Sequence, residues 1–375
     1  MKLGIIVYGL DRPITGIGYY TLELVKALAE LDPRPDMTLL CAGHPGPLSG
    51  VVPKHEVALS NARLLPFLMT WGQFAIYQQA KKLKLDVLHD PTGAAPLALA
   101  ATKKIVTIHD VIPYVYPNTS TRLDWLIYRY WLPLAVRRLD AVITDSQQSK
   151  ADIAQYLPLP MEKITVIPCA ANRHYRPLDI VDVQPVLTRH GIAGPYILYV
   201  GSIAARKNLP RLLEAYAQVR QWSTHWRLVI VGARQWKSSP VYETVQRLNL
   251  GEHVYFTGYV EEADLPALYN GADLFVFPSL YEGFGLPVLE ALACGTPVVT
   301  SKSSSLPEVA GDAALLVDPY NVEDIAHAMR RILADQALAQ DLRARGLKRA
   351  AQFSWERTAR ETLAVYEQVL GEKLT

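Results

Sequence analysis

The sequence predicts an α/β protein built from two parallel-sheet domains, and three observations carry this prediction. The chain has 375 residues, which is too long for one ordinary domain. Short apolar runs alternate with amphipathic helical patterns, as in successive βαβ units. The alternation loosens after Pro168 and then restarts, which indicates two halves of similar size.

The first half carries six apolar runs that are typical of buried strands. An amphipathic pattern from Tyr20 to Leu31 predicts the helix after the first of them, and similar patterns separate most of the others. The predicted strands are Leu3–Tyr8, Thr38–Ala42, Val87–His89, Ile105–Ile108, Ala141–Thr144 and Ile164–Ile167.

The second half begins after a stretch that we interpret as a linker. Residues 172–195 carry turn residues and little strand signal. The predicted strands that follow are Tyr196–Val200, Arg227–Val231, Val254–Thr257, Leu274–Pro278, Pro297–Thr300 and Ala314–Val317, and a helix is predicted over Trp355–Leu370. We therefore expect domains over 1–185 and 186–354, with 355–375 packing back on the first.

Composition excludes several classes of protein. The formal net charge of +2 gives no strong field for nucleic acid. The three cysteines are far apart, so neither a metal cluster nor a disulfide framework is expected. The N-terminal stretch is interpreted as a first strand rather than a signal peptide, and nothing in the sequence has the apolar length of a membrane span. We expect a cytoplasmic protein.

Gly16 and Gly18 lie between the first predicted strand and the first predicted helix, in the pattern G-x-G-x-x-T. A dinucleotide-binding turn needs a third glycine and a position directly after the strand, so nicotinamide binding is disfavoured. One interpretation is a glycine loop that lets the helix start. The other, which we favour, is a loop whose backbone N–H groups approach a ligand phosphate or sugar.

A second candidate stretch follows the strand that ends at Gly201. Arg206 and Lys207 come just before a helix with Pro210 in its first turn. A charged loop is usually only solvated, but two cations at a helix entrance oppose the helix dipole. They indicate a compensating anion such as a pyrophosphate.

A third candidate stretch is Ser279–Val299, where Glu282 precedes a Gly-Phe-Gly turn and Glu290 follows eight residues later. The pattern predicts a helix from about Leu286 to Ala293, ended by Gly295. The two glutamates can act together only if Glu282 lies in the loop before the helix. Two carboxylates that bind hydroxyls on either side of a phosphate suit a nucleotide-sugar.

These motifs resemble the retaining glycosyltransferases of family 4. The resemblance is carried by "EGFGLPVLE", "GSIAARKN", "FTGYVEEADLPALYNGADLFVFPS" and "GIGYYTLEL", and it spans nearly the whole chain. It implies the GT-B fold, in which two Rossmann-like parallel-sheet domains face each other across a cleft. The tracts "TIHDVIPYVYP" and "LHDPTGAAPL" are similar to those of mannosyltransferases that build bacterial surface polysaccharides.

The resemblance also implies roles for single residues. Arg206, Lys207, Glu282 and His109 would be catalytic, with Arg206 standing in for an arginine that some relatives carry where this chain has Ser202. His109 would orient a donor hydroxyl or assist the acceptor; otherwise it is a satisfied histidine at a strand end. The donor-binding set would be Gly16, Gly18, Gly201, Arg206, Lys207, Tyr259, Val260, Glu282, Gly283, Phe284, Gly285, Leu286 and Glu290.

The implied chemistry is transfer of a hexose without a metal or cofactor, from a nucleotide-sugar that is itself a substrate. No two aspartates of the sequence are separated by a single residue, so the Asp-x-Asp metal motif of other glycosyltransferases is missing. By resemblance, GDP-mannose is our first choice of donor and a UDP-sugar is second. A non-catalytic sugar-nucleotide-binding protein is the alternative from another class.

The acceptor is least defined. Residues 122–139 interleave arginines with tryptophans and tyrosines, a pattern typical of a helix that lies on a membrane surface. The other interpretation is a core helix with a solvated basic edge. Contact with the inner membrane face would suit a lipid-linked saccharide acceptor.

Overall fold

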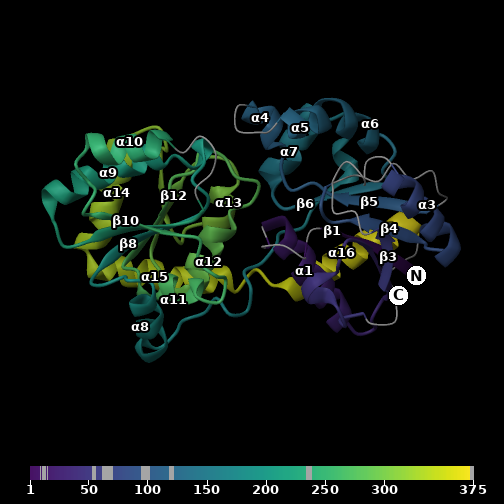
Figure 1. The fold of residues 1–375 in the computed structure, drawn as a ribbon, viewed down its shortest axis with the longest axis horizontal. Helices are drawn as coiled ribbons and strands as arrows, with labels where there is room; N and C mark the ends of the chain where they lie inside the picture. Colours follow the sequence, from purple (N-terminus) through teal and green to yellow (C-terminus); the bar gives the residue numbers. More distant parts are fainter. Residues whose placement is uncertain are drawn as a thin grey trace. The chain divides into compact units, whose positions relative to one another are not determined.

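The fold is taken from a computed structural model, which describes residues 1–8, 10, 14, 16–52, 56–60, 71–93, 102–117, 122–233 and 239–371. The chain forms two compact units. The N-terminal unit comprises Met1–Cys169 and Ser354–Thr375, and the C-terminal unit comprises Ala170–Phe353 (Figure 1).

The N-terminal unit contains a seven-stranded sheet of order β3-β2-β1-β4-β5-β6-β7, in which every pair is parallel. Its strands are β1 (Lys2–Tyr8), β2 (Asp36–Ala42), β3 (Glu56–Ser60), β4 (Val87–Asp90), β5 (Lys103–Thr107), β6 (Ala141–Thr144) and β7 (Ile164–Val166). Six of the seven were predicted. The strand β3 was not predicted, because it is a short strand at the edge of the sheet with only three apolar residues in succession.

Helices connect these strands and include the C-terminal one. They are α1 (Gly16–Glu30), η1 (Gly46–Leu48), α3 (Trp71–Leu83), α4 (Ile112–Val115), α5 (Arg122–Leu126), η3 (Ile127–Trp131), α6 (Leu132–Val136), α7 (Gln147–Tyr156), η4 (Met161–Lys163) and α16 (Trp355–Leu370). Figure 1 shows α16, in yellow, lying beside the purple α1. Its Thr358 hydroxyl also donates to the carbonyl of Pro168, 2.7 Å away. The last helix of the chain is thus part of the N-terminal unit.

The C-terminal unit contains a six-stranded parallel sheet of order β10-β9-β8-β11-β12-β13. Its strands are β8 (Tyr196–Val200), β9 (Arg227–Val231), β10 (Val254–Gly258), β11 (Leu274–Phe277), β12 (Val298–Ser301) and β13 (Leu315–Val317). All six were predicted within one or two residues. The four residues of β11 are fully buried, because helices cover both faces of a parallel sheet.

The helices of the C-terminal unit lie in two layers. One layer includes α9, α10 and α14, and the other includes α11, α12 and α15 (Figure 1). The bounds are α8 (Ile180–Arg189), η5 (Ala205–Lys207), α9 (Leu209–Trp222), α10 (Ser239–Arg247), α11 (Leu265–Gly271), α12 (Leu286–Cys294), α13 (Leu306–Ala310), α14 (Val322–Ala334) and α15 (Gln336–Ala350).

The stretch that we interpreted as a linker belongs to the C-terminal unit and contains α8, which packs on α11. The amide of Asn270 binds it on both sides: Nδ2 donates to the carbonyl of Arg176 and Oδ1 accepts from the backbone N–H of Leu178, each at 2.9 Å. The unit therefore begins at Ala170 and not at residue 186.

Candidate active site

The strand order of the C-terminal sheet brings two of the three candidate stretches to one edge. The chain builds outward from β8 to β10 and then reverses, so that β11 pairs with β8 on its other side. Ligands of open α/β sheets bind at such a switch point, beside the carboxyl ends of the strands. The Arg206–Lys207 turn follows β8 and Glu282 follows β11.

Glycines keep the backbone bare where three adjacent strands end. Gly201, Gly232 and Gly258 follow or end β8, β9 and β10, and all three have positive φ, at 152°, 151° and 74°. A Cβ on Gly232 would lie 2.0 Å from the carbonyl oxygen of Gly201. Beyond Gly258, the side chain of Val260 is buried whereas Tyr259 is 56% exposed. Of these two predicted donor-binding residues, only the tyrosine presents its side chain to solvent.

The turn that carries Arg206 and Lys207 is the short helix η5, and Asn208 fixes its end. Asn208 has a left-handed backbone, with φ 63°. Its buried amide donates to the carbonyls of Pro278 and Pro319, at 3.0 and 2.6 Å, which ties the turn to the segments after β11 and β13. Lys207 Nζ lies 4.8 Å from the centre of the Phe277 ring, within the range of a cation–π contact.

Glu282 binds both cations of this turn. Its Oε1 accepts hydrogen bonds from Lys207 Nζ at 2.6 Å and from Ser279 Oγ at 2.5 Å, and its Oε2 accepts from Arg206 at 2.7 Å. The side chains of Lys207 and Glu282 are each less than 10% exposed. These three bonds use most of the roughly four acceptor positions of a carboxylate.

The charge of the Glu282 carboxyl follows from these contacts. Burial would raise the pKa of the Glu282 carboxyl, but Lys207 and Arg206 together outweigh burial and hold the pKa below its usual range. Glu282 is therefore ionised at neutral pH. One carboxylate beside two cations leaves a net positive charge at the switch point, which suits an anionic ligand.

Serines that sequence analysis did not single out hold the Glu282 backbone. The Ser304 hydroxyl accepts from the Glu282 N–H and donates to its carbonyl, at 3.1 and 2.6 Å. Ser305 Oγ lies 2.9 Å from the Glu282 carbonyl and 2.7 Å from that of Phe284. These residues belong to the run "SKSSS" after β12, whose turn composition was the available signal.

The loop after Glu282 leads into α12, as the sequence predicts. Gly285 has φ 114°, and a Cβ there would lie 2.7 Å from a methyl group of Leu306, so this position needs glycine. Phe284 is buried and packs edge to face with Phe353. Its side chain therefore serves packing, and its backbone lies in the loop just before the N-terminus of α12.

Glu290 lies one turn inside α12 and is held by Tyr269, whose hydroxyl donates to Oε2 at 2.8 Å. Burial and the nearby Glu262 raise the pKa of Glu290 to about 8. Glu262 in turn accepts from the Tyr175 hydroxyl at 3.1 Å. At neutral pH the Glu290 carboxyl is thus mostly protonated, and a protonated carboxyl can both donate to and accept from a hydroxyl. No signal in the sequence indicated the contacts of Tyr269, Glu262 and Tyr175 around Glu290.

His109 follows β5 in the N-terminal unit, and both of its ring nitrogens are bonded. Nδ1 donates to Asp145 Oδ2 at 2.6 Å and Nε2 donates to the carbonyl of Pro91 at 3.0 Å. Burial would lower the pKa of His109, but Asp145 and the Pro91 carbonyl raise it, to about 9. His109 is therefore an imidazolium at neutral pH. It has no lone pair with which to take the proton from the hydroxyl of an acceptor substrate.

Gly16 and Gly18 do not form a loop, which corrects the sequence interpretation. Both lie in the first turn of α1, which begins at Gly16. The helix starts four residues earlier than predicted because buried side chains from Tyr20 onward anchor it to the unit. A Cβ on Gly18 would lie 2.7 Å from Ile14, whereas Gly16 has no atom within 4 Å of such a Cβ.

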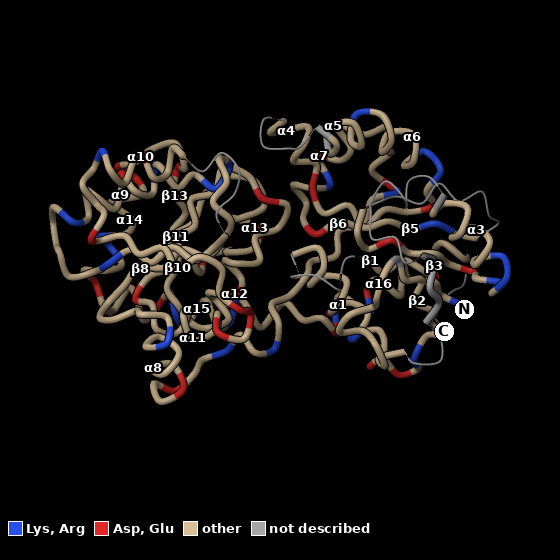
Figure 2. The backbone as a smooth tube through the Cα atoms, viewed as in Figure 1, with Lys and Arg blue, Asp and Glu red and all other residues tan. Residues whose placement is uncertain are grey.

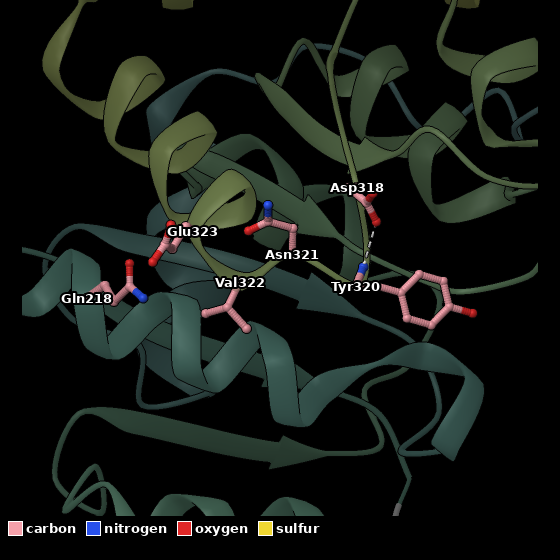
Figure 3. Close-up of a pocket in the computed structure, with 6 residues that line it drawn as sticks. All are labelled: Gln218, Asp318, Tyr320, Asn321, Val322 and Glu323. Carbon is pink, nitrogen blue, oxygen red and sulfur yellow. Dashed lines mark hydrogen bonds between the residues drawn. The ribbon is translucent and has the colours of Figure 1, made fainter.

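A hollow that the sequence did not indicate lies between α9 and the segment after β13. It has a volume of about 480 Å³ and is lined by Gln218, Asp318, Tyr320, Asn321, Val322 and Glu323 (Figure 3). None of the predicted donor-binding residues lines it. Among the residues that the structure describes, no group of three or more His, Cys, Asp or Glu side chains could hold a metal ion.

Two Rossmann-like parallel-sheet units, one of which carries a cationic switch point, are the architecture of glycosyltransferases with the GT-B fold. Known proteins agree. The family described as "Glycosyl transferases group 1" matches residues 190–349 and "Glycosyltransferase Family 4" matches 14–174. The chain is 33% identical to the O-antigen chain mannosyltransferase B of Escherichia coli, over 98% of this chain and 100% of that one. This chain belongs to glycosyltransferase family 4 and is a hexosyltransferase.

Other relatives extend the comparison. The MMP alpha-(1->4)-mannosyltransferase of Mycolicibacterium hassiacum is 26% identical over 99% of both chains. Among solved structures, sucrose-phosphate synthase from Thermosynechococcus elongatus has a TM-score of 0.78 at 23% identity, over 99% of both chains. Anabaena Alr3699/HepE in complex with UDP and glucose also has a TM-score of 0.78, at 19% identity, over 98% of this chain and 100% of that one. These structures show the fold.

Proposed function

We propose that this enzyme transfers mannose from GDP-mannose to a saccharide or a lipid-linked saccharide, with retention of configuration and without a metal. The observation that carries the donor site is the pairing of Arg206 and Lys207 with the buried Glu282 at the switch point. Mannose is favoured because several relatives, including the one of 33% identity, are named mannosyltransferases.

In this proposal the C-terminal unit binds the donor and the N-terminal unit binds the acceptor. The diphosphate lies against Arg206, Lys207 and the N-terminus of α12. When the bond between the sugar and the β-phosphate breaks, negative charge grows on the phosphate, and these groups stabilise it as a metal ion would elsewhere. Glu282 holds both cations in place before the donor arrives, so little reorganisation is needed.

The two glutamates and the turn after β10 bind the sugar and the nucleoside of the donor. The protonated Glu290 donates to one ribose hydroxyl and accepts from the other. Glu282 keeps an acceptor position on Oε2 for a donor-sugar hydroxyl. The nucleobase lies against the turn at Tyr259 and Val260, largely through backbone groups.

The proton of the acceptor hydroxyl goes to an oxygen of the departing phosphate. His109 is already protonated and is bonded to Asp145, so it serves as a cation that orients a donor hydroxyl and not as a base. In the transfer step the acceptor oxygen bonds to the anomeric carbon, the sugar–phosphate bond breaks, and the nucleoside diphosphate leaves with the acceptor proton. A front-face reaction of this kind retains configuration.

A UDP-sugar is the second candidate donor. It is favoured by the fold shared with a protein solved with UDP and glucose. The two candidates differ in the base, which the exposed Tyr259 would meet on either donor.

The N-terminal unit also carries a surface that we propose lies on a membrane. Large apolar residues on α5, η3 and α6 are 42 to 59% exposed: Leu123, Trp125, Leu126, Tyr130 and Leu134. The opposite side of these helices is buried, through Ile127, Leu132 and Val136. One side of the stretch thus packs on the core of the N-terminal unit, and an apolar stripe on it stays exposed. Three arginines of the same segment, at 129, 137 and 138, are also exposed, and Figure 2 shows blue basic positions along α5 and α6. Basic side chains beside an exposed apolar stripe suit anionic lipid.

The test is calorimetry and turnover with GDP, UDP, ADP and their sugar conjugates, with EDTA present. We expect GDP-mannose to bind most tightly and to be consumed with a saccharide acceptor. Lys207→Ala should lower turnover by on the order of 10²–10³-fold. Lys302→Ala removes an exposed lysine that pairs with Asp318, and should leave turnover unchanged. A strict metal requirement, or full activity of Lys207→Ala, would contradict the proposal.

A further inference from the structure

A chain of buried hydrogen bonds links the C-terminal helix to the middle of the N-terminal sheet. The Tyr366 hydroxyl of α16 lies 2.7 Å from Nδ1 of His89 on β4. His89 Nε2 lies 2.9 Å from the Thr107 hydroxyl at the end of β5. That hydroxyl lies 3.3 Å from the Tyr20 hydroxyl of α1. All four residues are at most 2% exposed.

This series of buried hydrogen bonds ends beside His109. The Tyr20 ring meets the His109 ring edge to face, with centroids 4.6 Å apart and an interplanar angle of 78°. Thr107 precedes His109 by two residues on the same strand end. The Tyr20 ring also packs against Trp355, the first residue of α16, with ring centroids 5.7 Å apart. Thus α16 contacts the neighbours of His109 through Trp355 and, by way of His89, through Tyr366.

The two histidines of this region differ in charge: His89 is neutral and His109 is positive. Burial and the nearby His109 lower the pKa of His89 to about 3, so its imidazole is neutral. A neutral imidazole donates from one nitrogen and accepts at the other, and two hydroxyl partners satisfy both. The other titratable groups around the pair are Asp145 and Asp110 beside His109, and Cys169 near Tyr20. A buried polar network with every member bonded fixes one arrangement of side chains.

We propose that Tyr366, His89 and Thr107 are positioning residues, which set the orientation of the Tyr20 ring and through it the orientation of His109. The C-terminal helix thereby completes the active site of the N-terminal unit. This inference rests on the proposed role of His109 in transfer. None of the three residues touches substrate; each acts through its neighbour.

The contrasting possibility is that these buried hydrogen bonds only stabilise the fold. In that case removal of a hydroxyl lowers stability and leaves the catalytic step and the surroundings of His109 unchanged. If the chain orients His109, removal of a hydroxyl lowers kcat in protein that remains folded. A displacement of about 1 Å at a reacting group can slow a reaction by about 100-fold.

The test uses Tyr366→Phe, Thr107→Val and the double variant in the full chain. Each change keeps the size and shape of the side chain and removes one hydroxyl. We expect kcat with GDP-mannose and a saccharide acceptor to fall between roughly 10-fold and 100-fold in each single variant. The double variant should fall no further than the worse single one, because linked residues act as a unit. The Kd of GDP should not change, since its predicted site lies in the other unit.

A second readout does not need turnover. The NMR signal of the His109 Cε1–H group, assigned with a His109→Asn variant, reports the position of the Tyr20 ring beside it. We expect this signal to shift in Tyr366→Phe. The matched control is Tyr196→Phe, which removes an equally buried hydroxyl that donates to the Leu268 carbonyl in the C-terminal unit. It should change neither kcat nor the His109 signal.

Two results would overturn the inference: an unchanged kcat in folded Tyr366→Phe and Thr107→Val, or an unmoved His109 signal in both. If the wild-type enzyme turns over no nucleotide-sugar, the proposed function fails, and the NMR signal still decides whether the chain orients His109.

Discussion

The carboxylate of Glu282 shows how a single residue takes its role from its partners. Resemblance implies contact with donor-sugar hydroxyls, and the structure adds that Glu282 binds Lys207 and Arg206 directly. The motif predicted the residue types at this edge of the sheet. It did not predict the ion pairs, because Lys207 and Glu282 are 75 residues apart in the chain and meet only through the pairing of β8 with β11.

Glu290 carries a prediction about pH. Its pKa of about 8 in the folded protein exceeds that of an unfolded glutamate, so the native state retains a proton that the unfolded chain loses from about pH 4.5 upward. The stabilisation is complete below that pH and is lost as the pH rises through 8. We expect the free energy of unfolding to fall by about 1 kcal/mol from pH 7 to pH 9 on this account. Denaturant melts at several pH values measure it.

The comparison variant is Glu290→Gln, which keeps the shape of a neutral carboxyl and cannot ionise. Its free energy of unfolding should depend less on pH between 7 and 9, and nucleoside diphosphate binding should weaken above pH 8 in the wild type only. The same pH slope in both proteins would show that Glu290 does not titrate near 8.

At the scale of elements, strands were predicted better than helices. Buried parallel strands such as β8 and β11 consist of continuous apolar runs, which are hard to mistake between turn residues. The helix α8 was missed because Pro185 lies inside it and turn residues surround it. Its support comes from α11, about 80 residues further along the chain. The early start of α1 was missed because two glycines disfavour a helix locally, and packing outweighs them.

The stripe on α5, η3 and α6 carries the prediction of membrane contact. We expect the wild type to sediment with vesicles that contain phosphatidylglycerol and not with purely zwitterionic vesicles. The reason is that basic side chains of the same segment attract anionic lipid while the apolar stripe enters the bilayer surface. A double variant, Leu126→Glu with Leu134→Glu, should abolish sedimentation, since both leucines are about half exposed. No helix in the described ranges has the length and apolarity to cross a bilayer.

The control for that experiment is Ile180→Glu with Val181→Glu. These residues are more exposed than the stripe, at 67% and 72%, and they lie on α8 in the C-terminal unit. Equal loss of sedimentation in the two double variants would mean that general surface hydrophobicity, and not the stripe, holds the protein on vesicles.

At the scale of the whole molecule, the division into units differs from the division of the chain. The N-terminal unit needs both ends of the sequence, because α16 returns to it with buried residues such as Ala359, Val365 and Tyr366. The C-terminal unit is one continuous segment with its own sheet. Every predicted donor-binding residue except Gly16 and Gly18 belongs to it.

A fragment of residues 170–353 should therefore fold alone and bind GDP with nearly the Kd of the full chain. Residues 1–169 alone should not unfold cooperatively, because loss of α16 removes the partners of His89 and Tyr20. Circular dichroism melts and calorimetry measure both properties. If the fragment 170–353 melts cooperatively but fails to bind the nucleotide that the full chain binds, the diphosphate site needs groups from the N-terminal unit, and Arg206, Lys207 and Glu282 do not suffice.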